Sequence, residues 1–183
     1  MSKVNFGKHS DFVVKQENPF NASPPVKLLG RSSVTPTELF FVRSHGDVPM
    51  VNVDGYRLVV NGNVSKSFSL SLNELKNNFE RVEVSATLQC AGNRREELIA
   101  VQPIPHELPW GVEAISHAAW AGARLRDVLT AAGVDSEASL HQHVDFGGLD
   151  ETERLNTRFN FGGSIPLTKA LNAEVILAYE MNG

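Results

Sequence analysis

Residues 82–95, with the sequence VEVSATLQCAGNRR, join a strand pattern to a group of polar and reactive side chains. Apolar residues occupy every second position from Val82 to Leu88, which predicts a half-buried strand. Cys90 follows directly after this strand, and small residues beside it are expected to leave room for a bulky group. The asparagine and two arginines of residues 93–95 make the turn polar and cationic, so it does not resemble a buried core segment.

The segments on either side of this stretch mix helix and strand signals. Before it, we expect a hairpin, with strands at 56–60 and about 64–68 around the turn dipeptide Asn61-Gly62, and a short helix to about Asn78 that starts with the capping box Ser71 to Glu74. After it, we expect a helix that begins near Leu125 and stops at Gly133. A short strand at 144–146 should follow and end at Gly147-Gly148. Next we expect a helix from Ser164 and Pro166 through Ala170, and then a buried strand at 175–179. Because no regular βαβ rhythm is present, the fold class is predicted to be α+β.

The length of 183 residues, with 42% hydrophobic and 21% charged residues, fits one compact soluble domain. Proline and glycine residues within 1–35 interrupt helix and strand patterns, which predicts an irregular N-terminal arm. Residues 36–183 are predicted to form the domain itself.

Composition also narrows the classes of function. Seventeen Lys and Arg residues against twenty-one Asp and Glu residues give a net charge of −4, and like charges do not cluster, which argues against nucleic-acid and polybasic membrane partners. A single cysteine excludes an internal disulfide framework and a multi-cysteine zinc site. No apolar run reaches the ~20 residues of a membrane span, and no secretory signal is evident, so the default expectation is an intracellular, cytoplasmic protein.

The residue type of Cys90 allows three interpretations of its role. A thiolate is a soft ligand that suits molybdenum, copper or zinc, and nearby guanidinium groups favour its charged form. A lone cysteine is also commonly a small buried hydrophobe, and six histidines leave open a cysteine–histidine nucleophile, as in a cysteine hydrolase. His141 and His143 could ligate a metal from one face of a strand, although partly exposed strand histidines that bind no metal are commoner.

Several longer blocks resemble a known family. The blocks are FFVRSHGDVP at 40–49, ATLQCAGNRR at 86–95, Trp110-Gly111 with AIS at 114–116, WAGARL at 120–125, HVDFGGLD at 143–150, GSIP at 163–166 and LAYEMNG at 177–183. In order and spacing they are similar to the molybdenum-cofactor domain of sulfite oxidases and eukaryotic nitrate reductases. The resemblance implies a mixed-sheet sulfite oxidase-type molybdopterin-binding fold and a molybdenum–molybdopterin cofactor.

The resemblance also implies residues that hold this cofactor. Cys90 matches the cysteine whose thiolate binds molybdenum beside the two sulfurs of the pterin. Asp150 matches a further cofactor contact. The stretch that cradles the pterin is matched by Phe41, Val42, Arg43, Ser44 and His45, with His45 as a donor to the pterin edge.

The substrate pocket that the resemblance implies is cationic. Arg43, Arg95 and Trp110 match residues that face the substrate. Sulfite and sulfate are small oxyanions, and fixed guanidinium forks recognise such anions by paired hydrogen bonds.

The activity implied is oxidation of sulfite to sulfate by oxygen-atom transfer, with electrons passing to an external acceptor. Residues 86–89 and 114–116 look like the sulfite-oxidising branch of the family, which favours sulfite over nitrate. A nitrate reductase molybdenum domain and a catalytically silent, truncated cofactor-binding fragment are the alternatives. Family members are expected to form homodimers through a C-terminal domain, and a mitochondrial intermembrane-space or peroxisomal location is compatible with the resemblance.

This chain departs from the family pattern at three places. Ser44 stands where the family usually has asparagine, and one extra residue lies within residues 102–109, before Trp110. The family continues beyond the position of Gly183 into further pterin-binding and substrate-binding residues. We therefore expect an amino-terminal portion of the domain, incomplete at its C-terminus, which alone binds the cofactor poorly.

Overall fold

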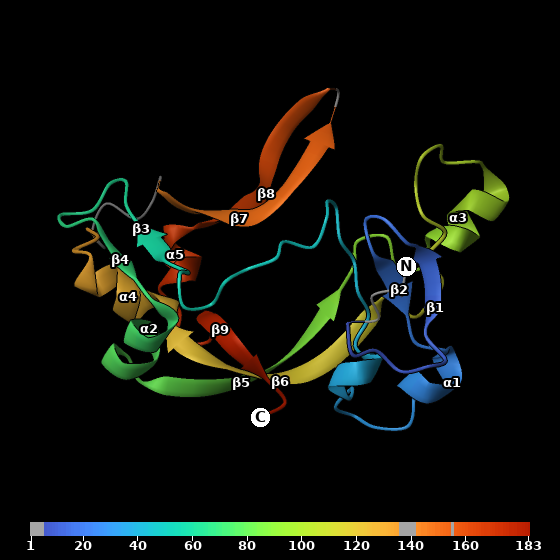
Figure 1. Ribbon diagram of the computed structural model, residues 1–183, viewed down its shortest axis with the longest axis horizontal. Helices are drawn as coiled ribbons and strands as arrows, with labels where there is room; N and C mark the ends of the chain where they lie inside the picture. The colour runs from blue at the N-terminus through green and yellow to red at the C-terminus, as the bar shows by residue number, and fades with distance from the viewer. Residues whose placement is uncertain (1–5, 136–141, 155) are drawn as a thin grey trace. The chain divides into compact units, whose positions relative to one another are not determined.

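The computed structural model describes residues 6–135, 142–154 and 156–183 (Figure 1). Helices and strands intermix along the chain, which confirms the predicted α+β class. The strand pairs whose register is described are all antiparallel: β1 (Val13–Gln16) with β2 (Asn21–Ser23), β3 (Leu58–Val60) with β4 (Phe68–Leu70), β6 (Ile115–Arg124) with β9 (Ile176–Met181), and β7 (His143–Arg154) with β8 (Thr157–Pro166). No helix in these residues is long and apolar enough to cross a membrane.

The chain divides into two compact units. The first unit consists of the chain up to Val48, residues Ser85–Ala119 and Asn182; the second consists of Pro49–Val84, Trp120–Met181 and Gly183. Strands β5 (Arg81–Gln89) and β6 (Ile115–Arg124) each run from one unit into the other along the chain. Whether residues 36–183 fold as one domain stays a prediction.

The first unit gives the N-terminal arm regular structure that its proline and glycine content did not predict. Its elements are β1 (Val13–Gln16), β2 (Asn21–Ser23), α1 (Val26–Leu29), a 3-10 helix (Thr37–Leu39) and α3 (Arg95–Val101). Strands of three or four residues are too short to show a sequence period, which is why residues 1–35 read as irregular. Ala22 and Val42 exchange backbone hydrogen bonds of 3.0 and 2.8 Å, so this arm pairs with the segment that carries several predicted site residues.

The second unit contains β3 (Leu58–Val60), β4 (Phe68–Leu70), α2 (Leu72–Asn78), α4 (Leu125–Ala131), β7 (His143–Arg154), β8 (Thr157–Pro166), α5 (Leu167–Ala170) and β9 (Ile176–Met181). The helix after Ser71 is confirmed, and its capping box is present in full. One face of α4 contributes to both hydrophobic clusters of the unit, through Val128 in one and through Leu125 and Leu129 in the other. This explains why the helical spacing before Gly133 is readable in the sequence.

The predicted two-residue turn at Asn61-Gly62 is wrong. Val60 pairs with Phe68, so residues 61–67 form a longer loop between β3 and β4. The backbone N–H groups of Ser65 and Lys66 donate to carbonyls at the end of α4, at 3.2 and 2.9 Å. Contact with α4, which local sequence does not reveal, therefore determines the length of this loop.

The glycine pairs in the β7–β8 hairpin also behave differently from the prediction. Gly147 pairs with Gly162 inside the ribbon, so Gly147-Gly148 does not end the strand. A Cβ at Gly162 would lie 2.1 Å from the Phe146 carbonyl oxygen, so close strand approach requires glycine there. Ser164 lies in β8, and the predicted helix starts only after Pro166. Figure 1 shows the hairpin as a two-stranded ribbon that extends away from α5.

Candidate active site

Cys90 lies directly after β5, as predicted, and its side chain is partly exposed. Its backbone N–H donates to the carbonyl of Ala114 at 3.0 Å, which ties it to the segment before β6. The backbone N–H of Gly92 donates to Cys90 Sγ at 3.3 Å. The sulfur thus accepts a hydrogen bond, and its partial exposure leaves it open to a ligand.

The turn after Cys90 is held closed by backbone hydrogen bonds. Asn93 N–H donates to the Cys90 carbonyl at 2.9 Å, and Arg95 N–H donates to the Gly92 carbonyl at 3.0 Å. The side-chain oxygen of Asn93 accepts from Ala114 N–H at 3.0 Å. The Cys90 loop is therefore a rigid turn between β5 and α3.

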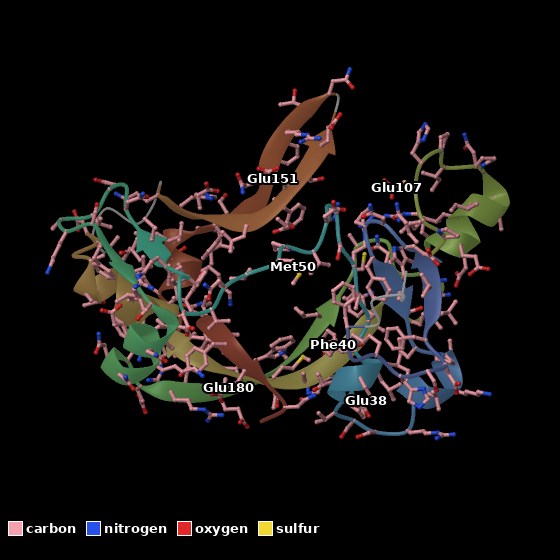
Figure 2. The ribbon with its side chains drawn as sticks, viewed as in Figure 1. Glu38, Phe40, Met50, Glu107, Glu151 and Glu180 are labelled. Carbon is pink, nitrogen blue, oxygen red and sulfur yellow. The ribbon has the colours of Figure 1, made fainter. Side chains whose placement is uncertain are left out.

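The two neighbouring arginines of this turn have different environments. Arg94 is largely exposed and forms two hydrogen bonds, of 2.7 and 2.8 Å, with the carboxylate of Glu97. Arg95 is only 18% exposed at its side chain, and its Nη1 contacts Glu107 Oε2 at 2.9 Å and the Leu108 carbonyl at 3.1 Å. Figure 2 labels Glu107 in the loop that follows α3. Burial therefore distinguishes Arg95, the predicted site residue, from Arg94.

Gly92 has a different use from the predicted one. A Cβ at this position would lie 2.5–2.7 Å from the guanidinium atoms of Arg95. The space that the missing side chain of Gly92 leaves is thus occupied by the Arg95 guanidinium. Gly92 serves to bring a cation close to the turn that carries Cys90.

Trp110 is fully buried, and its Nε1 is the one buried side-chain nitrogen or oxygen without a hydrogen-bond partner in the described parts of the chain. Its ring and that of Phe41 form a T-shaped pair with centroids 6.5 Å apart, and Lys15 Nζ lies 5.8 Å from the Trp110 ring centroid. The Trp110 carbonyl accepts from Glu96 N–H at 2.9 Å, which joins it to the start of α3. A buried N–H without an acceptor is costly, so this atom is suited to an acceptor supplied by a ligand.

A buried ion pair beside Trp110 was not predicted. Lys15 Nζ lies 2.8 Å from Glu113 Oε1, which also accepts from Ser23 Oγ at 3.2 Å and from Gly111 N–H at 3.3 Å. Burial raises the pKa of the Glu113 carboxyl, but the hydrogen bond and charge of Lys15 and the backbone N–H groups together lower that pKa below its ordinary value. No sequence signal identifies this pair, because its members are far apart along the chain.

Asn21 forms hydrogen bonds to the segment 41–45, which is predicted to bind the pterin. Its Oδ1 accepts from Ser44 N–H at 2.8 Å and from Arg43 Nη1 at 3.4 Å, and its Nδ2 donates to the Ser44 carbonyl at 3.1 Å. Arg43 Nη1 also donates to the Ser44 carbonyl. Arg43 Nη2 lies 3.3 Å from His45 Nδ1, and because a guanidinium only donates, a hydrogen bond between them requires Nδ1 to be the acceptor.

The first compact unit thus contains most of the predicted site residues, namely Phe41, Val42, Arg43, Ser44, His45, Cys90, Arg95 and Trp110. Asp150 belongs to β7 of the second unit and is partly exposed. In the described residues no three His, Cys, Asp or Glu side chains gather as a metal site. His143 Nδ1 lies 3.1 Å from Ser164 Oγ, and His141 is outside the described residues.

Comparison with known proteins gives a consistent family. The family model described as oxidoreductase molybdopterin binding domain matches residues 45–183. The chain is 49% identical over 178 residues to sulfite oxidase of Gallus gallus and 48% identical over 182 residues to mitochondrial sulfite oxidase of Homo sapiens. It is 36% identical over 170 residues to nitrate reductase [NADH] of Hordeum vulgare.

These relatives are longer than the chain. The matches cover 96%, 96% and 91% of this chain but only 38%, 32% and 18% of the three relatives. Among solved structures, the sulfane dehydrogenase SoxCD of Paracoccus pantotrophus matches with a TM-score of 0.74 and 23% identity, over 98% of this chain and 44% of that one. That likeness supports the fold.

Proposed function

This chain belongs to the oxidoreductase molybdopterin-binding domain family, and we propose that it takes part in oxidation of sulfite to sulfate at a molybdenum centre ligated by Cys90. One observation carries the proposal: Cys90 presents a partly exposed sulfur that accepts a backbone N–H, in a turn covered by the cation of Arg95. A soft anionic donor beside a fixed cation suits both a molybdenum ion and a small oxyanion.

The donors in the first unit fit a molybdenum–molybdopterin group. Cys90 would supply the soft sulfur ligand, and residues 41–45 would hold the pterin, with His45 as a donor to the pterin edge. Asp150, in the second unit, stays a predicted contact. When bound, the cofactor supplies two-electron redox chemistry, for which the protein side chains alone have no equivalent.

The cationic side chains bind and orient the substrate in this proposal. Arg43 and Arg95 are held by hydrogen bonds to buried or backbone groups, so their guanidinium planes are set before an anion arrives. Such pre-organisation reduces the entropy lost on binding. Trp110 Nε1, which has no partner in the described residues, would gain an acceptor from a bound oxyanion.

Sulfite is the favoured substrate because the sulfite oxidase relatives are more similar to this chain than the nitrate reductase is. The electrons removed from sulfite must leave to an external acceptor. Association into dimers and a cytoplasmic location stay predictions; the sulfite oxidase of Homo sapiens is named as mitochondrial.

Metal analysis of the cofactor-loaded protein tests the ligand. In a longer protein that contains this chain, we expect stoichiometric molybdenum and sulfite-oxidising activity. Loss of a ligand exceeds the effect of losing a supporting group, so Cys90→Ser should lower activity at least ~100-fold and change the metal–sulfur spectrum.

Ser85→Ala, on the exposed side of β5, is the matched control and should retain both properties. An unchanged metal–sulfur spectrum in Cys90→Ser would exclude Cys90 as the ligand. Turnover of nitrate but not sulfite by the unchanged protein would replace sulfite with nitrate as the substrate.

A further inference from the structure

We infer that Glu107 competes with the anionic substrate for Arg95 and so sets the affinity of the pocket for oxyanions. The inference rests on the proposed function of Arg95 in binding the substrate anion. Glu107 would then be a residue that determines affinity and anion selectivity, with no part in the redox chemistry.

The contact between the two residues is direct and is made by a largely buried cation. Glu107 Oε2 lies 2.9 Å from Arg95 Nη1, within a charge-assisted hydrogen bond. The guanidinium also lies against Gly92 and donates to the Leu108 carbonyl. These contacts hold Arg95 in place, so an anion must approach the guanidinium where it already lies.

Glu107 itself is held much more loosely. Its side chain is 44% exposed, and its backbone N–H makes a long hydrogen bond of 3.4 Å to the Ile104 carbonyl. Residues 102–107 lie outside any helix or strand and are exposed. The carboxylate can therefore leave Arg95 for water at low cost, whereas Arg95 cannot follow it.

The chemistry of the two anions makes them exchangeable. A carboxylate and a sulfur oxyanion both present a pair of oxygens to a guanidinium fork. While Glu107 is paired with Arg95, its charge also opposes the approach of another anion. A pair formed in ~80% of molecules would raise the apparent dissociation constant about fivefold, because only the open fraction binds.

The experiment titrates inorganic sulfate into the 183-residue chain by calorimetry, with ionic strength held constant by sodium chloride. Glu107→Gln should bind sulfate about three- to fivefold more tightly than the unchanged chain. In the cofactor-loaded protein the same variant should lower the KM for sulfite by a similar factor and leave kcat unchanged.

Glu97→Gln is the matched control. It removes the same charge from an exposed carboxylate of α3, but that carboxylate pairs with Arg94 instead of Arg95. Its sulfate affinity should stay within about 1.5-fold of the unchanged chain, since screened surface charges act weakly at a distance. The side-chain Nε–H resonance of Arg95 should shift in Glu107→Gln and not in this control.

A double-variant cycle distinguishes competition at Arg95 from a general effect of charge. In an Arg95→Gln background, Glu107→Gln should no longer change the sulfate affinity. A gain in affinity that persists in this background would overturn the inference, as would unchanged or weaker binding by Glu107→Gln alone.

The same cycle separates this inference from the proposed function. If Arg95→Gln weakens sulfate binding but Glu107→Gln does not strengthen it, Arg95 is an anion-binding residue, but Glu107 does not compete with the anion for it. If Arg95→Gln leaves sulfate binding unchanged, Arg95 is not an anion-binding residue, and the inference fails with the pocket on which it rests.

Discussion

Asn21 shows how a single buried amide can organise a site. Its side chain is fully buried and hydrogen-bonds both the N–H and the carbonyl of Ser44, much as a neighbouring strand would. It also accepts from Arg43, one of the two proposed anion-binding cations. The position of Arg43 therefore depends on a residue that carries none of the predicted chemistry.

Replacing Asn21 should therefore reduce both stability and anion binding. Asn21→Ala removes the acceptor of the Ser44 N–H and one of the acceptors of Arg43 at a buried position, so we expect a loss of about 2–4 kcal/mol in the free energy of unfolding. Urea unfolding measures this loss. Sulfate affinity, measured under conditions where the variant is still folded, should also fall.

Asn63→Ala, in the exposed loop between β3 and β4, provides the comparison and should change stability by less than about 0.5 kcal/mol. Unchanged sulfate affinity in folded Asn21→Ala would show that Arg43 does not need this support.

At the scale of elements, sequence patterns predict where a helix or strand begins when that element contains all the interactions that define it. Helix α2 is an example, because Ser71 Oγ accepts from Glu74 N–H at 3.1 Å and the Glu74 carboxylate accepts from Ser71 N–H at 2.7 Å. Both partners lie within four consecutive residues. The start of this helix was therefore readable from the sequence, whereas the ends of β7 were not.

Removal of the cap tests whether this local device matters in the folded chain. Ser71→Ala should lower the free energy of unfolding by about 1 kcal/mol, the usual cost of losing a serine N-cap. The midpoint of urea unfolding measures it. Ser67→Ala, in the exposed loop before β4, removes a similar hydroxyl outside a cap; an equal effect of the two substitutions would argue against a specific capping contribution.

At the scale of the whole molecule, the Lys15–Glu113 pair joins segments that are distant in sequence. It links β1 to the loop that carries Trp110, and Glu113 is only 8% exposed. The pKa of Glu113 is lowered in the folded chain, so the unfolded chain binds a proton more readily at this position. The contribution to stability is then complete above the ordinary glutamate pKa of about 4.3 and is lost as pH falls through the lower, folded-state pKa.

Glu113→Gln should make the free energy of unfolding depend less on pH in the acidic range. At about pH 7 the variant should lose roughly 1–3 kcal/mol, because Lys15 keeps its charge without its partner. As pH falls below the ordinary glutamate pKa of about 4.3, the difference from the unchanged chain should shrink, since the unfolded chain takes up a proton at this position before the native carboxyl does. Urea unfolding at a series of pH values measures both. Exposed Glu151→Gln is the control, and a difference that grows on acidification would contradict the prediction.

Features that depend on neighbours in the chain could be predicted from the residue order alone. The strand before Cys90, the capping box of α2 and the stop of α4 at Gly133 all follow from local periodicity or local hydrogen bonding. The long matched blocks predicted the family, and the domain match confirms it. Residue types and order were sufficient for these conclusions because each rests on a few consecutive positions.

The groups that surround the predicted residues became known from the folded structure. It placed Arg95 over Gly92 and beside Glu107, made Asn21 the support of Arg43, and buried Trp110 beside Lys15 and Glu113. These contacts join residues whose separation in the chain carries no period, so no pattern in the sequence predicts them. Their energies depend on burial and distance, and both exist only once the chain has folded.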